Sequence, residues 1–420
     1  MTINNNYSES TEYQKILKNL VITESNPGSV VKDFETLLTY IKDGVEVSGI
    51  NNLLNMRLLP QINAGLSKSI DICLKRPQQK SYPHINGLYL LLRATALGLI
   101  TAKVKNKTIS LNEEYLEKWN NLNNTEKYFT LLQAWWCRGT GEVLGEYVSG
   151  CLDFRYRCIE FFTKISRKGL LINQDTRKLE NLKYYPGIYN LALMELFGML
   201  SIEHVSPNER NKGWNIEHIN TTEIGDALIG SFIEVLTSLD YEAYWYSTEI
   251  SRFREFNEWF ASIKDCFSEF KQLLTFPEHK FQNGIHTFKI SLSNCWRRIA
   301  VSGNVEMDKF ASIILDAFGF NQDHLYCFKY QSRFGITTLI NTPELLPELL
   351  SENITADNIC IGELPLYPGL EVLFEYDLID RWQFRIIVEE IDAEEIEAYY
   401  YHIIQKHGKA PQQYGGKINL

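Results

Sequence analysis

The sequence predicts an α+β protein with a mainly helical N-terminal region and a small β-grasp-like α+β domain at its C-terminal end. Through much of residues 28–275, apolar residues recur three and four apart, which is typical of amphipathic helices. From residue 286 the period changes to two, which is typical of half-buried strands. One helical stretch interrupts these strands, so a helix packed across a small sheet is expected.

Length and composition place the chain among globular proteins with ample core. It has 420 residues, of which 45% are hydrophobic and 13% aromatic, and this length suggests two or three units. No run approaches the roughly 18 apolar residues that cross a bilayer, and residues 1–26 contain no apolar signal-peptide core. We therefore expect a cytoplasmic protein that does not contact membranes.

Charge is unevenly distributed. The formal net charge is −10, and residues 281–420 contain 11 Lys and Arg against 19 Asp and Glu. An acidic domain repels phosphates, so any contact with nucleic acid is expected in the N-terminal region. The eight cysteines show no CxxC spacing, which favours reduced thiols over a zinc site or a disulfide framework.

The N-terminal region begins with a polar stretch. Residues 1–27 are rich in Asn, Ser, Thr and Glu and are expected to form a flexible tail. Helical patterns then follow at residues 31–41 and 58–67, with a short strand-like stretch at 45–47 between them.

A helix, a hairpin and a second helix are expected next. Residues 84–99 are apolar almost all round, residues 99–103 and 108–111 have strand character, and a helix begins near Glu113. This order is typical of a winged helix.

The same order returns about a hundred residues later. Asn220 and Glu223 have the spacing of a capping box before the last helix of this second copy. The sequence therefore predicts tandem winged-helix-like units within residues 28–275, and residues 276–285 are the expected linker to the final domain. The four stretches of the second copy are residues 189–200, 201–205, 214–219 and 221–236.

Two groups of basic residues are candidates for binding nucleic acid, and a solvated surface is the alternative for both. A recognition helix needs exposed polar residues that reach base edges, but the helical stretches before each hairpin are too apolar and are expected to be buried. The candidates are therefore lysines of the first hairpin and basic residues interleaved with aromatic ones. They are Lys103, Lys105, Lys107, Arg155, Arg157, Arg167 and Lys168.

The final domain, residues 286–420, has the clearest pattern. Strands are expected at 286–292 and 296–301, followed by an amphipathic helix at 307–318 with Gly319 as its C-terminal cap. Further strands are expected at 324–330, 372–376 and 382–391.

Several motifs of this domain resemble, in order, the plasmid pRiA4b ORF-3-like family. They are Trp296-Arg297-Arg298, Phe318-Gly319-Phe320, His324-Leu325 with Phe328, Phe374-Glu375-Tyr376-Asp377, Asp380 with Trp382, and Pro411 with Gly415-Gly416. The resemblance covers about the last third of the chain. It implies a bacterial protein, and a role in a mobile-element or phage-defence nucleoprotein assembly.

The chain departs from this family pattern at several polar positions. Ile379 stands where the family has a glycine, and Phe384 where it usually has a histidine. Gln412, Gln413 and Tyr414 replace the family's closing acidic and cysteine residues. Amides neither ionise nor replace a carboxylate at a hard cation, so catalysis at this end is not expected.

One constellation at the strand ends of the small sheet is a candidate binding site. It comprises Trp296, Arg297, Arg298, His324, Tyr376, Asp377, Asp380 and Trp382. In one interpretation, the arginines pair with Asp377 or Asp380 while the tryptophans fill the core. In the other, the residues form a pocket for a peptide or a nucleotide, with arginine holding an anion.

The sequence contains no Walker loop, dinucleotide fingerprint, HExxH or GxSxG motif. We therefore expect no catalytic residues, no metal ligands and no cofactor. The favoured function is a non-catalytic interaction or adaptor protein whose partner is another protein. The alternatives are a DNA-binding regulator that uses the winged-helix-like units and a degenerate metal-dependent nuclease or hydrolase.

Overall fold

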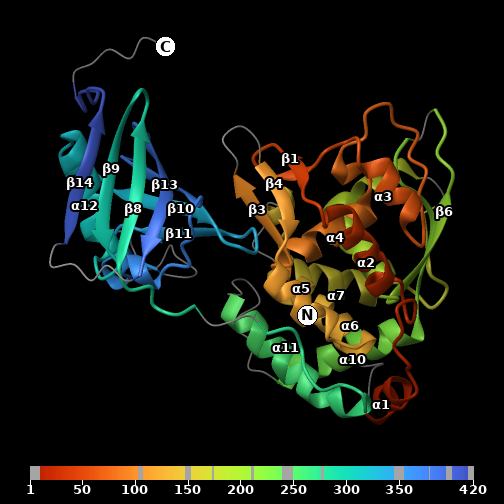
Figure 1. Ribbon diagram of the computed structural model, residues 1–420. Coiled ribbons are helices and arrows are strands. Elements are labelled where there is room, and N and C mark those ends of the chain that lie inside the picture. The colour runs from red at the N-terminus through yellow and green to blue at the C-terminus, as the bar shows by residue number, and fades with distance from the viewer. Residues whose placement is uncertain are drawn as a thin grey trace. The chain divides into compact units, whose positions relative to one another are not determined.

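The structure is a computed structural model in which the chain divides into two compact units, Met1–Thr275 and Phe276–Leu420. It describes residues 10–102, 107–146, 153–172, 175–209, 212–238, 249–275, 279–344, 354–377, 379–393 and 400–414. The class is mixed α and β, with most helices in the first unit and a large sheet in the second (Figure 1).

The first unit is a group of helices with two small antiparallel sheets. Its strands pair in the orders β2-β1-β4-β3 and β5-β7-β6. The helices are α1 (Ser10–Lys18), α2 (Val30–Ile41), α3 (Leu59–Gly65), α4 (Pro83–Ala94), α5 (Glu113–Asn120), α6 (Asn124–Arg138), α7 (Phe154–Lys164), α8 (Thr176–Leu182), α9 (Ile188–Leu196), α10 (Glu223–Ser238) and α11 (Glu249–Ile263). The strands are β1 (Val45–Ser48), β2 (Leu53–Leu54), β3 (Gly98–Ala102), β4 (Lys107–Leu111), β5 (Leu170–Leu171), β6 (Leu200–Val205) and β7 (Asn215–Thr221).

Helices α4 and α9 form the centre of this unit. Every residue of α4 is buried, and α9 is buried from Tyr189 to its last residue, Leu196. The two helices pack against each other, and a Cβ on Gly87 would lie 2.8 Å from Cγ of Leu193. Only glycine permits this approach, and the apolar character of both helices follows from burial on all sides.

Both expected helix, hairpin and helix sequences are present. The first is α4, β3, β4 and α5, and the second is α9, β6, β7 and α10. Strand β4 also pairs with β1, so the first hairpin belongs to a larger sheet. The identification of these segments as winged-helix units stays a prediction.

Two local predictions about this unit were wrong. The expected flexible tail contains α1, because Tyr13 and Leu17 lie one helical turn apart and are buried where α1 packs on α10. The expected capping box before α10 is absent, because Asn220 lies within β7. Thr222 caps the helix instead, since its hydroxyl oxygen accepts the backbone N–H of Gly225 at 2.9 Å.

The second unit is an antiparallel sheet with one helix packed across a face. The strands are β8 (Ile285–Leu292), β9 (Cys295–Ser302), β10 (Tyr326–Gln331), β11 (Thr337–Asn341), β12 (Glu371–Tyr376), β13 (Trp382–Asp392) and β14 (Tyr401–His407), and the helix is α12 (Met307–Phe318). The order is β11-β10-β12-β13-β8-β9-β14. The expected hairpin, helix and further strands are all present, while β11 and β14 were not predicted.

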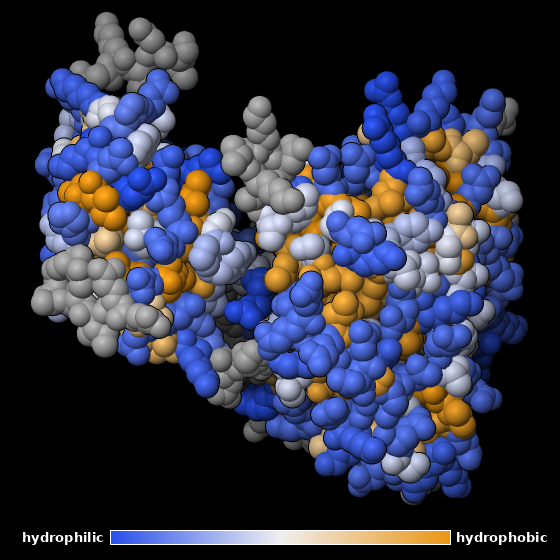
Figure 2. Space-filling view, viewed as in Figure 1, coloured by the Kyte–Doolittle hydropathy of each residue, from blue (hydrophilic) through white to orange (hydrophobic). Residues whose placement is uncertain are grey.

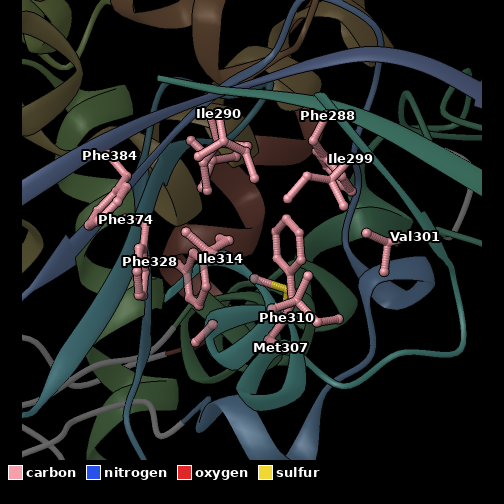
Figure 3. Close-up of a cluster of buried hydrophobic side chains, with 14 of the residues drawn as sticks. Phe288, Ile290, Ile299, Val301, Met307, Phe310, Ile314, Phe328, Phe374 and Phe384 are labelled. Carbon is pink, nitrogen blue, oxygen red and sulfur yellow. The ribbon is translucent and has the colours of Figure 1, made fainter. Parts of the chain in front are cut away.

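The core of the second unit lies between α12 and the inner face of the sheet (Figure 3). Burial alternates along β8 and β13, as the period-two pattern predicts. Phe310 of α12 lies 4.8 Å from Phe288 of β8 and 6.0 Å from Phe328 of β10, measured between ring centroids. Gly319 ends α12 in the left-handed conformation with φ of 74°, so its predicted role as the cap is confirmed.

Candidate functional site

The residues of the predicted constellation do not surround one pocket. Three of them lie on β9, and the others lie at the start of β10 and at the β12–β13 turn. Strands β8 and β13 separate β9 from β12.

Arg297 is buried on the helix side of the sheet and is 6% exposed. Its Nε donates a hydrogen bond to the carbonyl of Ala317 at 3.0 Å, near the C-terminal end of α12. Its Nη1 donates to the carbonyls of Trp296 at 2.9 Å and His407 at 3.0 Å, and the guanidinium lies over the ring of Phe318. Arg297 therefore joins α12, β9 and β14, and its charge faces the negative end of the helix.

Arg298 and Trp296 lie on the opposite face of the sheet. Arg298 donates through Nε and Nη2 to Glu389 at 2.6 and 3.0 Å, and these hydrogen bonds raise the pKa of Arg298. Trp296 stacks on His407 with ring centroids 5.5 Å apart, and Nζ of Lys289 lies 4.9 Å from the Trp296 ring.

The suggested pairing of these arginines with Asp377 or Asp380 was therefore wrong. Arg298 bonds Glu389 of β13 instead, and Asp377 and Asp380 lie at the β12–β13 turn. The suggestion that both tryptophans fill the core was also incorrect for Trp296. Trp382 is half-buried and packs edge to face on Phe320 at 5.1 Å.

His324, Tyr376 and Asp377 do come together. The Nε2 atom of His324 lies 3.7 Å from Oδ2 of Asp377, and its ring centroid lies 6.0 Å from that of Tyr376. Asp377 has φ of 58° and is 5% exposed. Its Oδ1 accepts the N–H groups of Ile379 at 2.9 Å and Asp380 at 3.2 Å. Asp377 therefore stabilises the β12–β13 turn, to which Asp380 contributes a backbone donor while its side chain is exposed.

Two residues that the sequence did not place at this site complete it, namely Asp323 and Tyr414. The hydroxyl of Tyr414 donates to Oδ2 of Asp323 at 2.8 Å and lies 2.9 Å from Nε2 of His324. The hydrogen bond from Tyr414 lowers the pKa of Asp323. Desolvation, and then the Asp323 carboxylate, raise the pKa of Tyr414 to about 12.

Gln413 also binds this loop, since its Oε1 accepts the N–H of Asn321 at 2.6 Å. The segment with Gln413 and Tyr414, where the chain departs from the family pattern, is thus held against the loop between α12 and β10. In the sequence, only these departures drew attention to Gln413 and Tyr414. An amide does not ionise, and the phenol of Tyr414 is neutral at pH 7, as its raised pKa also favours.

A second cluster, in the first unit, was missed from the sequence. His84 of α4, Glu195 of α9 and His204 of β6 each offer a ligand atom, and these atoms lie within 4.8 Å of one another. Glu195 accepts hydrogen bonds from Lys68 at 2.6 Å, His84 at 2.8 Å and His204 at 3.0 Å. Glu195 could have indicated this cluster in the sequence, because a single acid within an apolar buried helix requires polar partners.

Hydrogen bonding makes this cluster a poor cation site. The indole N–H of Trp214 donates to Nδ1 of His204 at 2.7 Å. An indole nitrogen only donates, so Nδ1 carries the lone pair and the Nε2 of neutral His204 carries the hydrogen that Glu195 accepts. A metal ion would need the Nε2 lone pair and would compete with the Lys68 ammonium for the same carboxylate.

The charge state of Glu195 agrees with this arrangement. Burial acts to raise the pKa of Glu195, but the hydrogen bonds from His204 and His84 outweigh it, so the pKa lies well below its ordinary value. An ionised Glu195 that accepts three donors is a hydrogen-bonding centre, which links α4, α9, β6 and the loop that carries Lys68.

The candidate nucleic-acid residues are in different environments. Lys103 and Lys105 lie outside the described residues. Lys107, Arg167 and Lys168 are exposed, and Arg157 is half-buried. Arg155 was an incorrect candidate, because it is 1% exposed and bonds Glu255 at 2.6 Å and Asp153 at 3.1 Å. Its place on the inner face of α7 was not evident from the spacing of charges.

A comparison with protein families identifies one match, and it lies within the second unit. Residues 285–418 match the family model of the plasmid pRiA4b ORF-3-like protein. A crystal structure of a protein of unknown function from Methanosarcina mazei Go1 is similar at 18% identity, covering 31% of this chain and 74% of that chain, with a TM-score of 0.28. None of the curated proteins matches. None of the helices in the described part of the chain is long and apolar enough to cross a membrane.

Proposed function

We propose that this chain, whose residues 285–418 form a pRiA4b ORF-3-like domain, is a non-catalytic interaction protein of the cytoplasm. Its partner would be another polypeptide, within a mobile-element or phage-defence assembly. That context comes from the family resemblance, and the interaction role comes from the site.

The observation that supports this proposal is that three charged groups of the candidate site already form hydrogen bonds within the fold. Arg297 bonds carbonyl groups, Arg298 bonds Glu389, and Asp377 accepts two N–H groups of its own turn. A catalytic acid, base or anion-binding arginine must keep a free donor or acceptor for its substrate. A docking surface has no such requirement.

Binding to nucleic acid is the second candidate function. It is favoured by Lys107, Arg167 and Lys168, which are exposed on the first unit. It would be a contact with the phosphate backbone, because α4 and α9 are buried and present no side chains to a groove.

The test is to isolate the full-length chain, tagged at its native level, from cells that produce it naturally. One half of the preparation is treated with nuclease, and both halves are examined by mass spectrometry and by the ratio of absorbance at 260 and 280 nm. We expect a polypeptide in stoichiometric amount that remains after nuclease treatment. Nucleic acid alone, or no companion at all, would overturn the proposal.

A variant pair tests the absence of catalysis in the same preparation. His324→Ala and Asp377→Asn are compared with the parent chain against phosphodiester and ester substrates. We expect no turnover by any of the three proteins. Turnover by the parent chain that both substitutions abolish would identify this site as catalytic.

A further inference from the structure

Strand β14 leaves one edge of the large sheet open. Six of its seven residues pair with β9, and no described residue pairs with its other side. The opposite edge, β11, is partly covered, since Asn341 bridges to Thr355 and its N–H donates to Ile354 at 3.1 Å. In an antiparallel pair, alternate residues direct their N–H and C=O groups away from the partner strand, so β14 presents a row of such groups about 23 Å long.

The side chains of this edge are unusually exposed for a strand. All residues of β14 except Ile403 are exposed. Tyr401 is 40% exposed, and Ile404, at a β-bulge opposite β9, is 49% exposed. The face of the second unit drawn in Figure 2 is largely hydrophilic, with separate hydrophobic patches. Exposed β-branched and aromatic residues along an open edge favour the addition of another strand.

Charge distinguishes this edge from the rest of the unit. Residues 281–397 contain 8 Lys and Arg against 19 Asp and Glu, whereas residues 398–420 contain three lysines and no acid. Lys406 and Lys409 are exposed and form no ion pair with any residue that the structure describes. The strand is therefore a basic edge on an acidic unit.

We propose that the outer edge of β14 binds an extended, acidic segment of a partner polypeptide, which joins the sheet as a further strand. This inference rests on the proposed interaction function and names the chemistry of the partner. Backbone hydrogen bonds would supply the pairing, and Lys406 and Lys409 would select acidic side chains.

Charge also disfavours two other occupants. A second copy would bring the same strand to the edge, so lysines of one strand would face the lysines and histidines of the other. Nucleic acid would approach a unit whose remaining surface carries an excess of carboxylates, which repel phosphates.

A labelled peptide tests the inference on the full-length chain. The probe is a fluorescent nine-residue peptide of alternating valine and glutamate, and its binding is followed by fluorescence anisotropy. We expect binding of this peptide and none of its counterpart with lysine in place of glutamate. A third peptide, with methylated backbone nitrogens, keeps the charges but cannot donate hydrogen bonds, and we expect it not to bind.

Two double variants locate the site. Lys406→Glu with Lys409→Glu should weaken binding of the acidic peptide by about tenfold or more, because two favourable charge contacts become unfavourable. Lys309→Glu with Lys329→Glu changes two exposed lysines of the same unit away from β14, and should leave binding unchanged. Equal thermal midpoints of the two variants show that both are folded.

Several results would overturn the inference. The first is that the acidic peptide does not bind, and the second is that both double variants lose the same amount of binding. The third is that the methylated peptide binds as well as the unmethylated acidic peptide. The fourth is that the parent chain and the Lys309 and Lys329 variant dimerise, whereas the Lys406 and Lys409 variant does not. If the natural polypeptide still copurifies with that variant, the proposed function stands and the β14 inference fails. If nothing copurifies with the parent chain, the proposed function fails. The peptide titration still shows whether the outer edge of β14 binds an acidic strand.

Discussion

At the scale of single residues, the Glu195 carboxylate is held by a network of hydrogen bonds. Its three donors come from α4, β6 and the loop that carries Lys68. Trp214 fixes the tautomer of His204 and so ensures that a donor faces the carboxylate. A buried carboxylate with this set of donors is stable only in its charged form.

Glu195→Gln should lower the free energy of unfolding by about 3 kcal/mol at pH 7. The amide keeps one acceptor but turns an N–H group toward one of the donors. The pKa of Glu195 is lowered by folding, so its stabilisation is present above the unfolded pKa of about 4.3 and is lost as the pH falls through the folded pKa. Urea unfolding between pH 7 and pH 3 measures both effects, and the variant should lose part of the acid dependence.

Lys68→Met is the control for this prediction. The Lys68 side chain is 52% exposed, so its ion pair should contribute less than about 1 kcal/mol. A larger loss in Lys68→Met than in Glu195→Gln would contradict the assignment of Glu195 as the centre of the network.

At the scale of elements, the close approach of α4 and α9 organises the first unit. A Cβ on Gly87 would lie 2.8 Å from Leu193, so the two helices approach closely there, and nearly all of their residues are buried. This explains why both helical patterns are apolar almost all round. Within this packing, neither helix presents an exposed polar face.

The start of α10 provides a test at the same scale. Thr222→Ala should lower the free energy of unfolding by about 1 kcal/mol, because the N–H of Gly225 loses its acceptor and the Gly198 carbonyl loses a donor at 2.7 Å. Asn220→Ala removes the residue that the spacing suggested as the cap, and should have a smaller effect. Thermal unfolding of the two variants compares them, and the reverse order would show that Asn220 is the cap.

At the scale of the whole molecule, the second unit has a core of its own. Among the described residues, the buried cluster that contains α12 extends from Phe288 to Val388, and the partly buried residues packed against it also belong to this unit. The sheet therefore does not need side chains from the first unit to fill its inner face.

Phe310→Ala removes the aromatic ring at the centre of this cluster and should lower the free energy of unfolding of the second unit by about 3 to 5 kcal/mol. Hydrogen exchange should rise in β8, β10 and α12 and stay unchanged in α4 and α9. Exchange measured on the full-length chain by mass spectrometry distinguishes these segments. Equal increases in both units would show that their stabilities are coupled.

Most helices and strands could be predicted from the sequence, because their signals are local. The period-two pattern from His286, the amphipathic helix before Gly319 and the apolar stretches of α4 and α9 each depend on burial along a single element. The prediction of a flexible tail at residues 1–27 was wrong because α1 is marked by only two buried apolar residues, Tyr13 and Leu17.

The side-chain partners at each site could not be predicted from the sequence. Which residue an arginine meets depends on strand order, and the order that places β13 and β8 between β9 and β12 is not encoded in the spacing of any motif. The network of Glu195 likewise joins residues that are more than a hundred positions apart. Local patterns specify which face of an element is buried, but the partners across that face follow from packing of the whole chain.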